Sequence, residues 1–417
     1  MISAQASTTA PEIRAAKRMI LAVNCGSSSL KFALYSEDQR GQLDQQLLSG
    51  EFSGLQPGGR LQLRWQDQAG SYSRNDFDTA SAADQAEAGF TLALASLQTL
   101  LEQIPGHYRL HAIAHRVVHG GADYTSATLL TPQIMQRLAE LNNLAPLHQP
   151  HNLAGINAFA LHYPEVAQVA CFDTAFHSQM PDYESRFALP LQLRQQGIRR
   201  YGFHGLSYHY ISQQLQALSQ RAGQRVIMLH LGSGASACAM QQGVSVASSM
   251  GFSALDGLIM GSRCGYLDPG VVLHLLRQGY DYQQLEQLLY KESGLLGLSG
   301  IAADMRSLRA SDSQSAQQAI QQFTYRIVRE IGSLSAVLQG IDVLVFTGGI
   351  GEHDAQLRQD VCQALGWLGV ALEPSRNLQQ AQQQSAMSLH TASSRAEIWA
   401  IPTDEGRIAA QQALALL

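Results

Sequence analysis

The chain has 417 residues, which suggests two domains, because a domain usually spans roughly 100–200 residues. It carries 28 Lys and Arg against 33 Asp and Glu, a net charge of −5, which argues against a nucleic-acid-binding protein with a concentrated basic face. The 45% hydrophobic content excludes a disordered or fibrous chain. No run approaches the roughly 18 apolar residues of a membrane-spanning helix, so no membrane partner is expected.

The N-terminal segment, MISAQASTTAPEIRAAKR, lacks the apolar core of a secretory signal, so residues 1–17 are expected to form a flexible extension. The five cysteines are odd in number and form no CxxC pair. They favour free thiols and a cytoplasmic location over a disulfide framework or a zinc ribbon.

The first half of the chain alternates strand-like and helix-like segments. An apolar run over 19–25 and the segment LKFALY flank a Gly/Ser turn and predict a β-hairpin. An exposed strand, two helices and two further strands follow, the last ending in an acid. These segments are 59–65 (strand), 87–104 (helix), 111–121 (strand and double-Gly loop), 132–141 (helix) and 166–173 (strand).

The second half restarts this pattern. Residues 225–240 again read as strand, Gly/Ser turn and strand, and residues 343–353 as a buried strand ending in a Gly-rich turn before a helix. A strand from Glu397 and a C-terminal helix close the chain. Alternating strands and helices predict an α/β fold. Two halves that open alike suggest a duplicated fold with a cleft between the halves.

The glycine-rich turns carry the first chemical signal. Such a turn leaves backbone N–H groups free to bind an anion, and glycine lets a phosphate approach closely. One such turn is equally an ordinary hairpin turn, but three in one chain suggest ATP. There is no GxxxxGK[ST] sequence and no strand-to-helix GxGxxG, so neither a P-loop nor a Rossmann nucleotide site is predicted.

Five charged or imidazole side chains stand beside glycines, prolines or strand ends: Arg116, His148, Asp173, His204 and Arg263. Phosphoryl transfer to an oxyanion needs this set, because arginines align two repelling anions and histidines stabilise the transferring charge. Each histidine can instead be structural.

The sequence signals for a metal site are weaker than those for phosphoryl transfer. His115 and His119 have zinc-like spacing, but they lie in a predicted strand without an HExxH glutamate. Magnesium needs few protein oxygens, and Asn24, Asp173 and Glu405 are candidates for them.

The ordered motifs VNCGSSSLKF, HRVVHGG, LAPLH, FDTAFH, RRYGFHG, HLGSGAS, SMGF, MGSRCGYLDPG, LLGLSG, DMR and FTGGIGEH resemble the acetate kinase family over residues 19–410. That family belongs to the actin-like ATPase superfamily with its ribonuclease H-like fold, two domains flanking an active-site cleft. The resemblance implies reversible, ATP-dependent phosphorylation of acetate to acetyl phosphate by direct in-line transfer. Mg²⁺, with Mn²⁺ as an alternative, is the implied metal.

The resemblance also implies residue roles. Arg116, Asp173, His204, Arg263 and His148 would be catalytic, with Asp173 orienting the acceptor and helping to hold the metal, and with Asn24 and Glu405 as its main ligands. The acetyl pocket would comprise Arg116, Val118, Leu147, Phe203 and Ala254. The nucleotide and its phosphates would lie against residues of four segments: Ser27, Ser29 and Lys31; His230, Leu231, Gly232, Ser233 and Gly234; Asp304, Met305 and Arg306; Gly349, Ile350, Gly351, Glu352 and His353.

The implied organisation is an N-terminal domain over 18–174, completed by 404–417, and a nucleotide-binding domain over 175–403. The family is a homodimer whose domains close on their substrates, which excludes water from the transfer.

The chain departs from the family pattern at four positions. Ser233 replaces an Asn, Tyr266 stands where an acid is common, and Gly406 replaces an acid beside Glu405. Ala254 replaces a proline of the acetyl pocket, which suggests that propionate is a secondary substrate.

Three alternatives remain open: a propionate or butyrate kinase, a catalytically silent actin-like binding or regulatory protein, and an actin-like phosphatase acting on polyphosphate or ppGpp. The silent protein would lack charged site residues, and the phosphatase would have no use for Arg116 and Arg263.

Overall fold

The structure is a computed structural model that describes residues 17–417 apart from 57–58, 78–85, 107, 382 and 384. Residues 1–16 of the predicted extension lie outside the described residues. Lys17 begins the first strand, so the predicted end of the extension is wrong by one residue.

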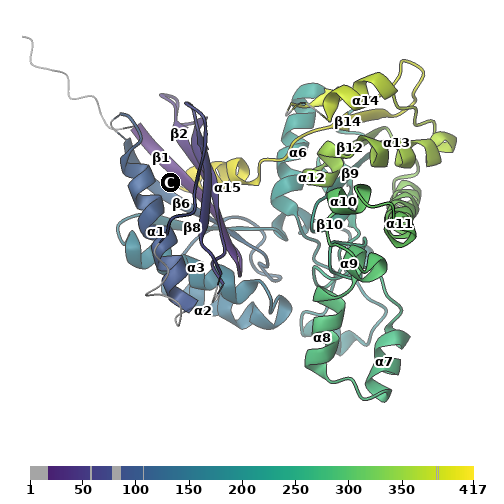
Figure 1. The fold of residues 1–417 in the computed structure, drawn as a ribbon, viewed down its shortest axis with the longest axis horizontal. Coiled ribbons are helices and arrows are strands. Elements are labelled where there is room, and N and C mark those ends of the chain that lie inside the picture. The colour runs from purple at the N-terminus through teal and green to yellow at the C-terminus, as the bar shows by residue number, and fades with distance from the viewer. Residues whose placement is uncertain (1–16, 57–58, 78–85, 107, 382, 384) are drawn as a thin grey trace, which may run out of the picture.

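The first half of the described chain forms an eight-stranded sheet with the order β5-β4-β3-β2-β1-β6-β8-β7 (Figure 1). Its strands are β1 Lys17–Cys25, β2 Ser29–Glu37, β3 Leu43–Ser53, β4 Gln62–Asp67, β5 Ser71–Arg74, β6 Tyr108–Val117, β7 Thr128–Leu129 and β8 Ala167–Phe172. β1 and β2 form the predicted hairpin, while β1, β6 and β8 run parallel. The carboxyl ends of these three parallel strands therefore meet at one edge.

Alternation along β1 gives this sheet two apolar faces. Leu21 and Val23 pack with residues of α1 (Ala86–Glu102) and α3 (Gln149–His162). Ile20 and Ala22 point the other way, toward α15 (Glu405–Leu414) and the start of α6 (Gly205–Leu218). The C-terminal helix thus returns to the first sheet. The remaining helices of this half are α2 Pro132–Glu140 and the short 3₁₀ helix η1 Leu141–Leu144.

The second half forms a six-stranded sheet with the order β11-β10-β9-β12-β14-β13. Its strands are β9 Val226–Leu231, β10 Ala235–Gln241, β11 Val244–Ser248, β12 Val343–Thr347, β13 Met387–Ser388 and β14 Glu397–Ala400. An antiparallel hairpin, β9–β10, again lies beside two parallel strands, β12 and β14. Both sheets therefore repeat the same core, as the duplicated α/β prediction requires.

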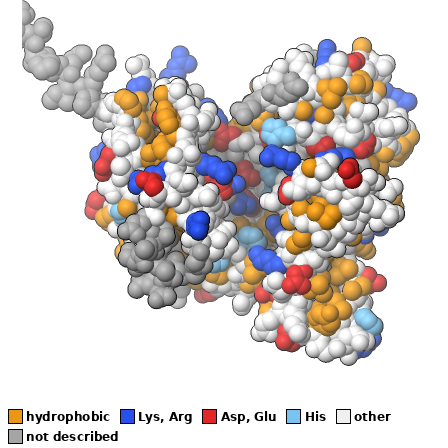
Figure 2. Space-filling model, viewed as in Figure 1, with side chains coloured by type: hydrophobic (Ala, Val, Ile, Leu, Met, Phe, Trp, Pro, Cys, Tyr) orange, Lys and Arg blue, Asp and Glu red, His pale blue; other side chains and the backbone are white. Residues whose placement is uncertain are grey.

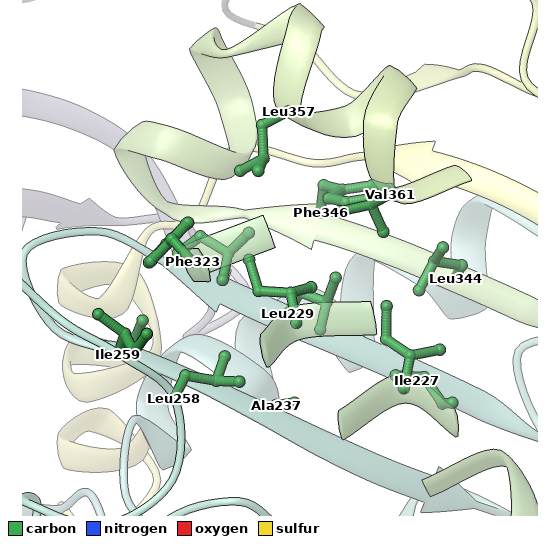
Figure 3. Close-up of a cluster of buried hydrophobic side chains, with 14 of the residues drawn as sticks. Ile227, Leu229, Ala237, Leu258, Ile259, Phe323, Leu344, Phe346, Leu357 and Val361 are labelled. Atoms are coloured by element: carbon green, nitrogen blue, oxygen red, sulfur yellow. The ribbon is translucent and has the colours of Figure 1, made fainter. Parts of the chain in front are cut away.

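Helices cover both faces of the second sheet. Phe323 of α11 packs with Leu229 and Phe346 from β9 and β12 on one face (Figure 3). Tyr208 of α6 packs with Val226 on the other. The other helices of this half are η2 Ala175–His177, α4 Asp182–Ser185, α5 Leu191–Gln195, α7 Pro269–Arg277, α8 Tyr282–Lys291, α9 Gly294–Ser299, α10 Met305–Arg309, α11 Gln314–Leu338, α12 Gly348–His353, α13 Ala355–Ala364, η3 Gly366–Leu368 and α14 Pro374–Gln380.

The helix after β12, α12, begins at Gly348 itself, so the predicted Gly-rich turn is shorter than expected. Gly348 alone makes the bend, with φ +76°, and a Cβ there would lie 2.7 Å from the Leu231 carbonyl oxygen. The Glu352 carboxylate then accepts the Gly348 N–H at 2.9 Å. One glycine therefore suffices for the turn, and the residues after it continue as helix.

Candidate functional site

The first cluster of site residues forms at the carboxyl edge of the eight-stranded sheet, around Arg116. Arg116 lies near the end of β6, and Asp173 directly follows the parallel neighbour β8. The guanidinium donates to both Asp173 oxygens, Nε to Oδ1 at 3.1 Å and Nη2 to Oδ2 at 2.5 Å. Asp173 is only 1% exposed, so this two-point pair fixes the plane of the guanidinium.

Two further side-chain oxygen atoms face the same guanidinium. Asn24, near the end of β1, accepts from Arg116 Nη1 at 3.3 Å, and the Glu405 Oε2 atom lies 3.5 Å from Nε. Burial lowers the pKa of Arg116, but the carboxylates of Asp173 and Glu405 outweigh it, so the pKa lies above its usual value. The Arg116 side chain is therefore always positively charged, and side-chain oxygen atoms surround it.

These oxygen donors border a cavity of about 530 Å³ that Asn24, Arg116, Glu352 and Glu405 line together with Lys31. Amide and carboxylate oxygens are the ligands that Mg²⁺ prefers, and one or two suffice where phosphates and waters supply the rest. The donor set therefore fits a magnesium ion. No group of three or more His, Cys, Asp or Glu among the described residues could hold a metal on its own.

The second cluster gathers around Arg263, on the second half of the chain. Its Nη1 donates to the Ala254 carbonyl at 2.6 Å, and among the described residues it has no carboxylate partner. A Cβ on Gly234, in the β9–β10 turn, would lie 3.2 Å from Arg263 Nη2 and 3.0 Å from His204 Nε2. The glycine thus allows a guanidinium, an imidazole and a turn backbone to meet.

His204 is held in an uncommon backbone conformation, φ +57°, immediately before α6. Its ring stacks on His230 at a centroid distance of 4.3 Å. Burial, with His230 and the two arginines nearby, lowers the pKa of His204 well below its usual value. For His148, burial, Arg263 and Arg116 lower the pKa to about 3. Both rings are therefore neutral at neutral pH.

Three of the four apolar side chains predicted for the acetyl pocket come together. Val118 and Phe203 belong to one buried cluster, and Ala254 packs against it. Leu147 is half-buried but does not belong to that cluster, although its neighbour Ala145 does.

Half of the residues predicted to bind the nucleotide lie around a second cavity, of about 590 Å³. The predicted residues that line it are Gly232, Ser233, Asp304, Met305, Arg306, Gly349, Ile350 and His353. His353 also lines the cavity beside Arg116, so the two cavities adjoin. Figure 2 shows charged and histidine side chains on both walls of the hollow between the two halves.

Some predicted nucleotide-binding residues lie elsewhere. Ser27 and Ser29, in the β1–β2 hairpin, line neither cavity, and Gly351 is buried inside α12. His230, Leu231 and Gly234 also line neither, while Glu352 lines only the cavity beside Arg116.

Sequence reasoning missed four residues that line this second cavity: Ala303, Arg309, Asp354 and Ala355. Arg309 pairs with Asp354 across the cavity, Nε to Oδ2 at 3.1 Å. All four lie within three residues of the DMR or GIGEH motif, and that position was the available signal.

The other departures from the family pattern have different surroundings. Tyr266 is 60% exposed, stacks with Arg326 and Arg329, and lies outside both cavities. Gly406 lines the cavity beside Arg116, where a Cβ would lie 3.0 Å from the Tyr35 hydroxyl.

The comparison with known families decides the identity. A model of the acetokinase family matches residues 19–411. The chain belongs to the acetokinase family. Its α/β architecture is accordingly the duplicated actin-like ATPase fold, with the two sheets described above as the repeated cores.

Members of the acetokinase family resemble the chain over nearly its whole length. It is 47% identical over 390 residues to the acetate kinase of Rhodopseudomonas palustris strain TIE-1, covering 93% of this chain and 95% of that one. It is 45% identical over 406 residues to the acetate kinase of Methylocella silvestris, covering 96% and 98%.

Solved structures agree. Porphyromonas gingivalis acetate kinase matches with a TM-score of 0.82 at 31% identity, covering 96% of this chain and all of that one. A propionate kinase from Francisella tularensis matches with a TM-score of 0.82 at 32% identity, covering 95% and 99%.

No helix among the described residues is long and apolar enough to cross a membrane.

Proposed function

We propose that the protein catalyses the reversible transfer of the γ-phosphoryl group of ATP to acetate, giving ADP and acetyl phosphate. The observation that carries this proposal is the Arg263 guanidinium, which donates to the Ala254 carbonyl and has no carboxylate partner in the described part of the chain, beside the neutral ring of His204 and the Gly234 turn. A cation without a carboxylate partner attracts an anion, and a turn that lets donors approach closely suits a phosphoryl group.

The acceptor acetate binds with its methyl group toward the apolar cluster of Val118, Phe203 and Ala254. Arg116 attracts its carboxylate, and Asp173 orients that carboxylate indirectly, because its two-point pair holds the guanidinium plane. Fixed geometry of this kind lowers the barrier by bringing two mutually repelling anions into line.

His204 and Arg263 hydrogen-bond to the transferring group, where negative charge spreads over its oxygens. His148, neutral and flanked by both arginines, supports them. The transfer is direct and in line, so no side chain carries the phosphoryl group.

Asn24 and Glu405 would hold Mg²⁺, with Mn²⁺ as an alternative, through the oxygen atoms that face Arg116. When bound, the metal neutralises phosphate charge. The adenosine and phosphates of ATP lie in the 590 Å³ cavity, which Gly349, Ile350, Asp304 and Arg306 line. Ser27, Ser29 and Lys31 approach the phosphates from the first hairpin when the halves close.

We also propose the division into 18–174 with 404–417 and 175–403, supported by the packing of α15 on β1 and β6. The enzyme is cytoplasmic, supported by its five free cysteines. It acts as a homodimer, as the family resemblance implies, with no nucleic-acid or membrane partner.

The test is a hydroxamate assay for acyl phosphate with ATP and Mg²⁺, run in parallel with acetate, propionate and butyrate. Acetate is expected to give the most product and propionate a measurable amount, because Ala254 removes ring volume from the pocket. No product with any acid, in a folded protein that binds ATP, would favour the silent binding protein. Phosphate release from ATP without any carboxylate would favour the phosphatase.

A further inference from the structure

Behind the His204 ring, two buried hydroxyl groups form a short chain of hydrogen bonds. His204 Nδ1 lies 2.8 Å from Ser236 Oγ, and Ser236 Oγ lies 2.5 Å from the Tyr208 hydroxyl. Ser236 and Tyr208 are 0% exposed. Tyr208 stands one helical turn after His204 on α6, and Ser236 lies on β10 opposite His230 of β9. Two separate elements thus converge on the far side of the ring.

The number of hydrogen atoms decides the tautomer of the ring. This series of hydrogen bonds contains two contacts, and each contact accommodates one hydrogen atom. If Nδ1 carried a hydrogen, the Ser236 and Tyr208 hydroxyls would bring the total to three, and one buried donor would lack an acceptor among the described residues. Buried donors without acceptors are rare. If Nδ1 carries none, Tyr208 donates to Ser236, Ser236 donates to Nδ1, and every hydrogen is used.

The other ring nitrogen faces the site. Nε2 lies beside the Gly234 turn and Arg263, within reach of a phosphoryl group bound there. Because burial and the neighbouring His230 and Arg116 lower the pKa of His204, the ring is neutral and has a single N–H. That N–H is therefore on Nε2.

We propose that Ser236 and Tyr208 are positioning residues that fix His204 as its Nε2–H tautomer, so that the ring presents a donor to the transferring phosphoryl group. This inference rests on the proposed function for its consequence, although the tautomer itself does not. It assigns His204 the work of a neutral hydrogen-bond donor and excludes it as a base that takes a proton from the acceptor.

A second histidine, His177, provides an internal reference for the tautomer measurement. His177 Nε2 lies 2.9 Å from the Phe203 carbonyl oxygen and its Nδ1 lies 2.8 Å from Ser245 Oγ. A carbonyl only accepts, so His177 in its neutral form carries its hydrogen on Nε2 whatever happens at Ser236.

The first experiment observes the tautomer directly. Full-length protein labelled with ¹⁵N-histidine is studied by NMR at neutral pH, and the His204 signal is assigned by its loss in His204→Asn. Wild-type protein is expected to show one protonated nitrogen, Nε2. Ser236→Ala should give a mixture of tautomers at His204 but leave the His177 signal unchanged, and Ser236→Thr should restore Nε2–H. An Nδ1–H signal in wild type, or an unchanged signal in Ser236→Ala, would overturn the proposal.

The second experiment asks what the tautomer does. Ser236→Ala should lower kcat about tenfold with KM values changed less than about twofold, because the lost interaction belongs to the transition state. Tyr208→Phe should cost about threefold, since Ser236 can still donate to Nδ1. The double variant should be no slower than Ser236→Ala, because both hydroxyls act through one contact.

Two matched controls remove a buried hydroxyl elsewhere. Ser335→Ala and Tyr163→Phe each delete a buried hydroxyl that has no hydrogen-bond partner among the described residues, and both should leave kcat unchanged. An equal loss of kcat in these controls, or no rescue by Ser236→Thr, would reduce the pair to a packing role and overturn the proposal. A wild-type protein with Nε2–H that forms no acyl phosphate would instead overturn the proposed function.

Discussion

Arg116 and Arg263 differ in how their charges are compensated. Arg116 contacts two carboxylates and an amide oxygen, from Asp173, Glu405 and Asn24. Arg263 donates to one backbone carbonyl, that of Ala254. The first guanidinium is an integral part of the fold, whereas the charge of the second is available to a substrate. The same residue type is therefore paired with carboxylates in one half and, among the described residues, has no carboxylate partner in the other.

The two pKa shifts follow the same division. Burial lowers the pKa of Arg116, but two carboxylates raise it further than burial lowers it. At Arg263, burial lowers the pKa, and no carboxylate in the described part of the chain opposes this shift. Mutations should consequently separate loss of activity from loss of stability.

Replacing Arg263 should have the largest effect on activity. Arg263→Ala should lower kcat/KM for acetate about a thousandfold, because a guanidinium aimed at the transferring phosphoryl group is lost. Its unfolding free energy should change by no more than about 1 kcal/mol, since no ion pair is broken. Arg263→Lys should recover part of the activity, because it keeps the charge without the planar fork. The hydroxamate assay and denaturant unfolding check this, and an active but unstable Arg263→Ala protein would contradict the comparison.

Replacing Arg116 should affect stability as well as activity. Arg116→Ala leaves Asp173 buried without a counter-ion, which should cost about 3–5 kcal/mol of unfolding free energy and about a hundredfold in kcat/KM. Denaturant unfolding measures the first quantity and the hydroxamate assay the second.

Two companion variants sharpen this result. Arg225→Ala breaks a more exposed two-point pair with Asp342, and should cost about 1 kcal/mol or less. Adding Asp173→Ala to Arg116→Ala should recover stability but not activity. If the double variant is no more stable than Arg116→Ala alone, the pair does not carry the stability of this region.

The metal side of the Arg116 cluster should respond more weakly. Glu405→Gln should raise the Mg²⁺ concentration for half-maximal activity about tenfold, because one charged ligand becomes neutral. Glu286→Gln, which alters an exposed carboxylate paired with Tyr282, is the control and should leave that concentration unchanged. A magnesium titration at fixed ATP decides, and equal curves for both variants would remove Glu405 from the metal site.

The smallest effect should come from the residue whose carbonyl holds Arg263. Ala254→Pro should lower the ratio of kcat/KM for propionate over acetate about fivefold, the lower end of the roughly 1–3 kcal/mol that one methylene contributes. Parallel assays with both acids measure it. A ratio that stays at the wild-type value would show that residue 254 does not set pocket size.

The fold could be predicted in outline from the sequence because its strands are apolar and its first hairpins end in Gly/Ser turns. The β1–β2 and β9–β10 hairpins and the strands before Asp173 and Gly348 follow from that pattern. The start of helix α12 could not be predicted in this way, because the sequence GGIGEH is typical of a turn. In the structure the Glu352 carboxylate accepts the Gly348 N–H and the helix begins there. A contact made by folding reversed the local preference.

The candidate site, like the fold, could be predicted only in part from the sequence. Ordered motifs sufficed to name residues such as Arg116 and Arg263, which the structure brings into two clusters. The hydroxyls behind His204 could not be named, because Ser236 reaches the ring through strand register and Tyr208 through helical spacing. Leu147 was named but lies apart, since motif order does not determine which apolar side chains share a cluster.

The return of α15 to the first sheet means that the chain passes between the two sheets twice, once before α6 and once after β14 (Figure 1). The second passage is anchored at Thr403, whose N–H donates to Glu352 at 3.3 Å and whose hydroxyl lies 2.9 Å from Ser207. The two halves are therefore joined by two segments of backbone instead of one, and the second segment is tied by hydrogen bonds to α6 and α12. Any movement of one half relative to the other must be accommodated by both segments.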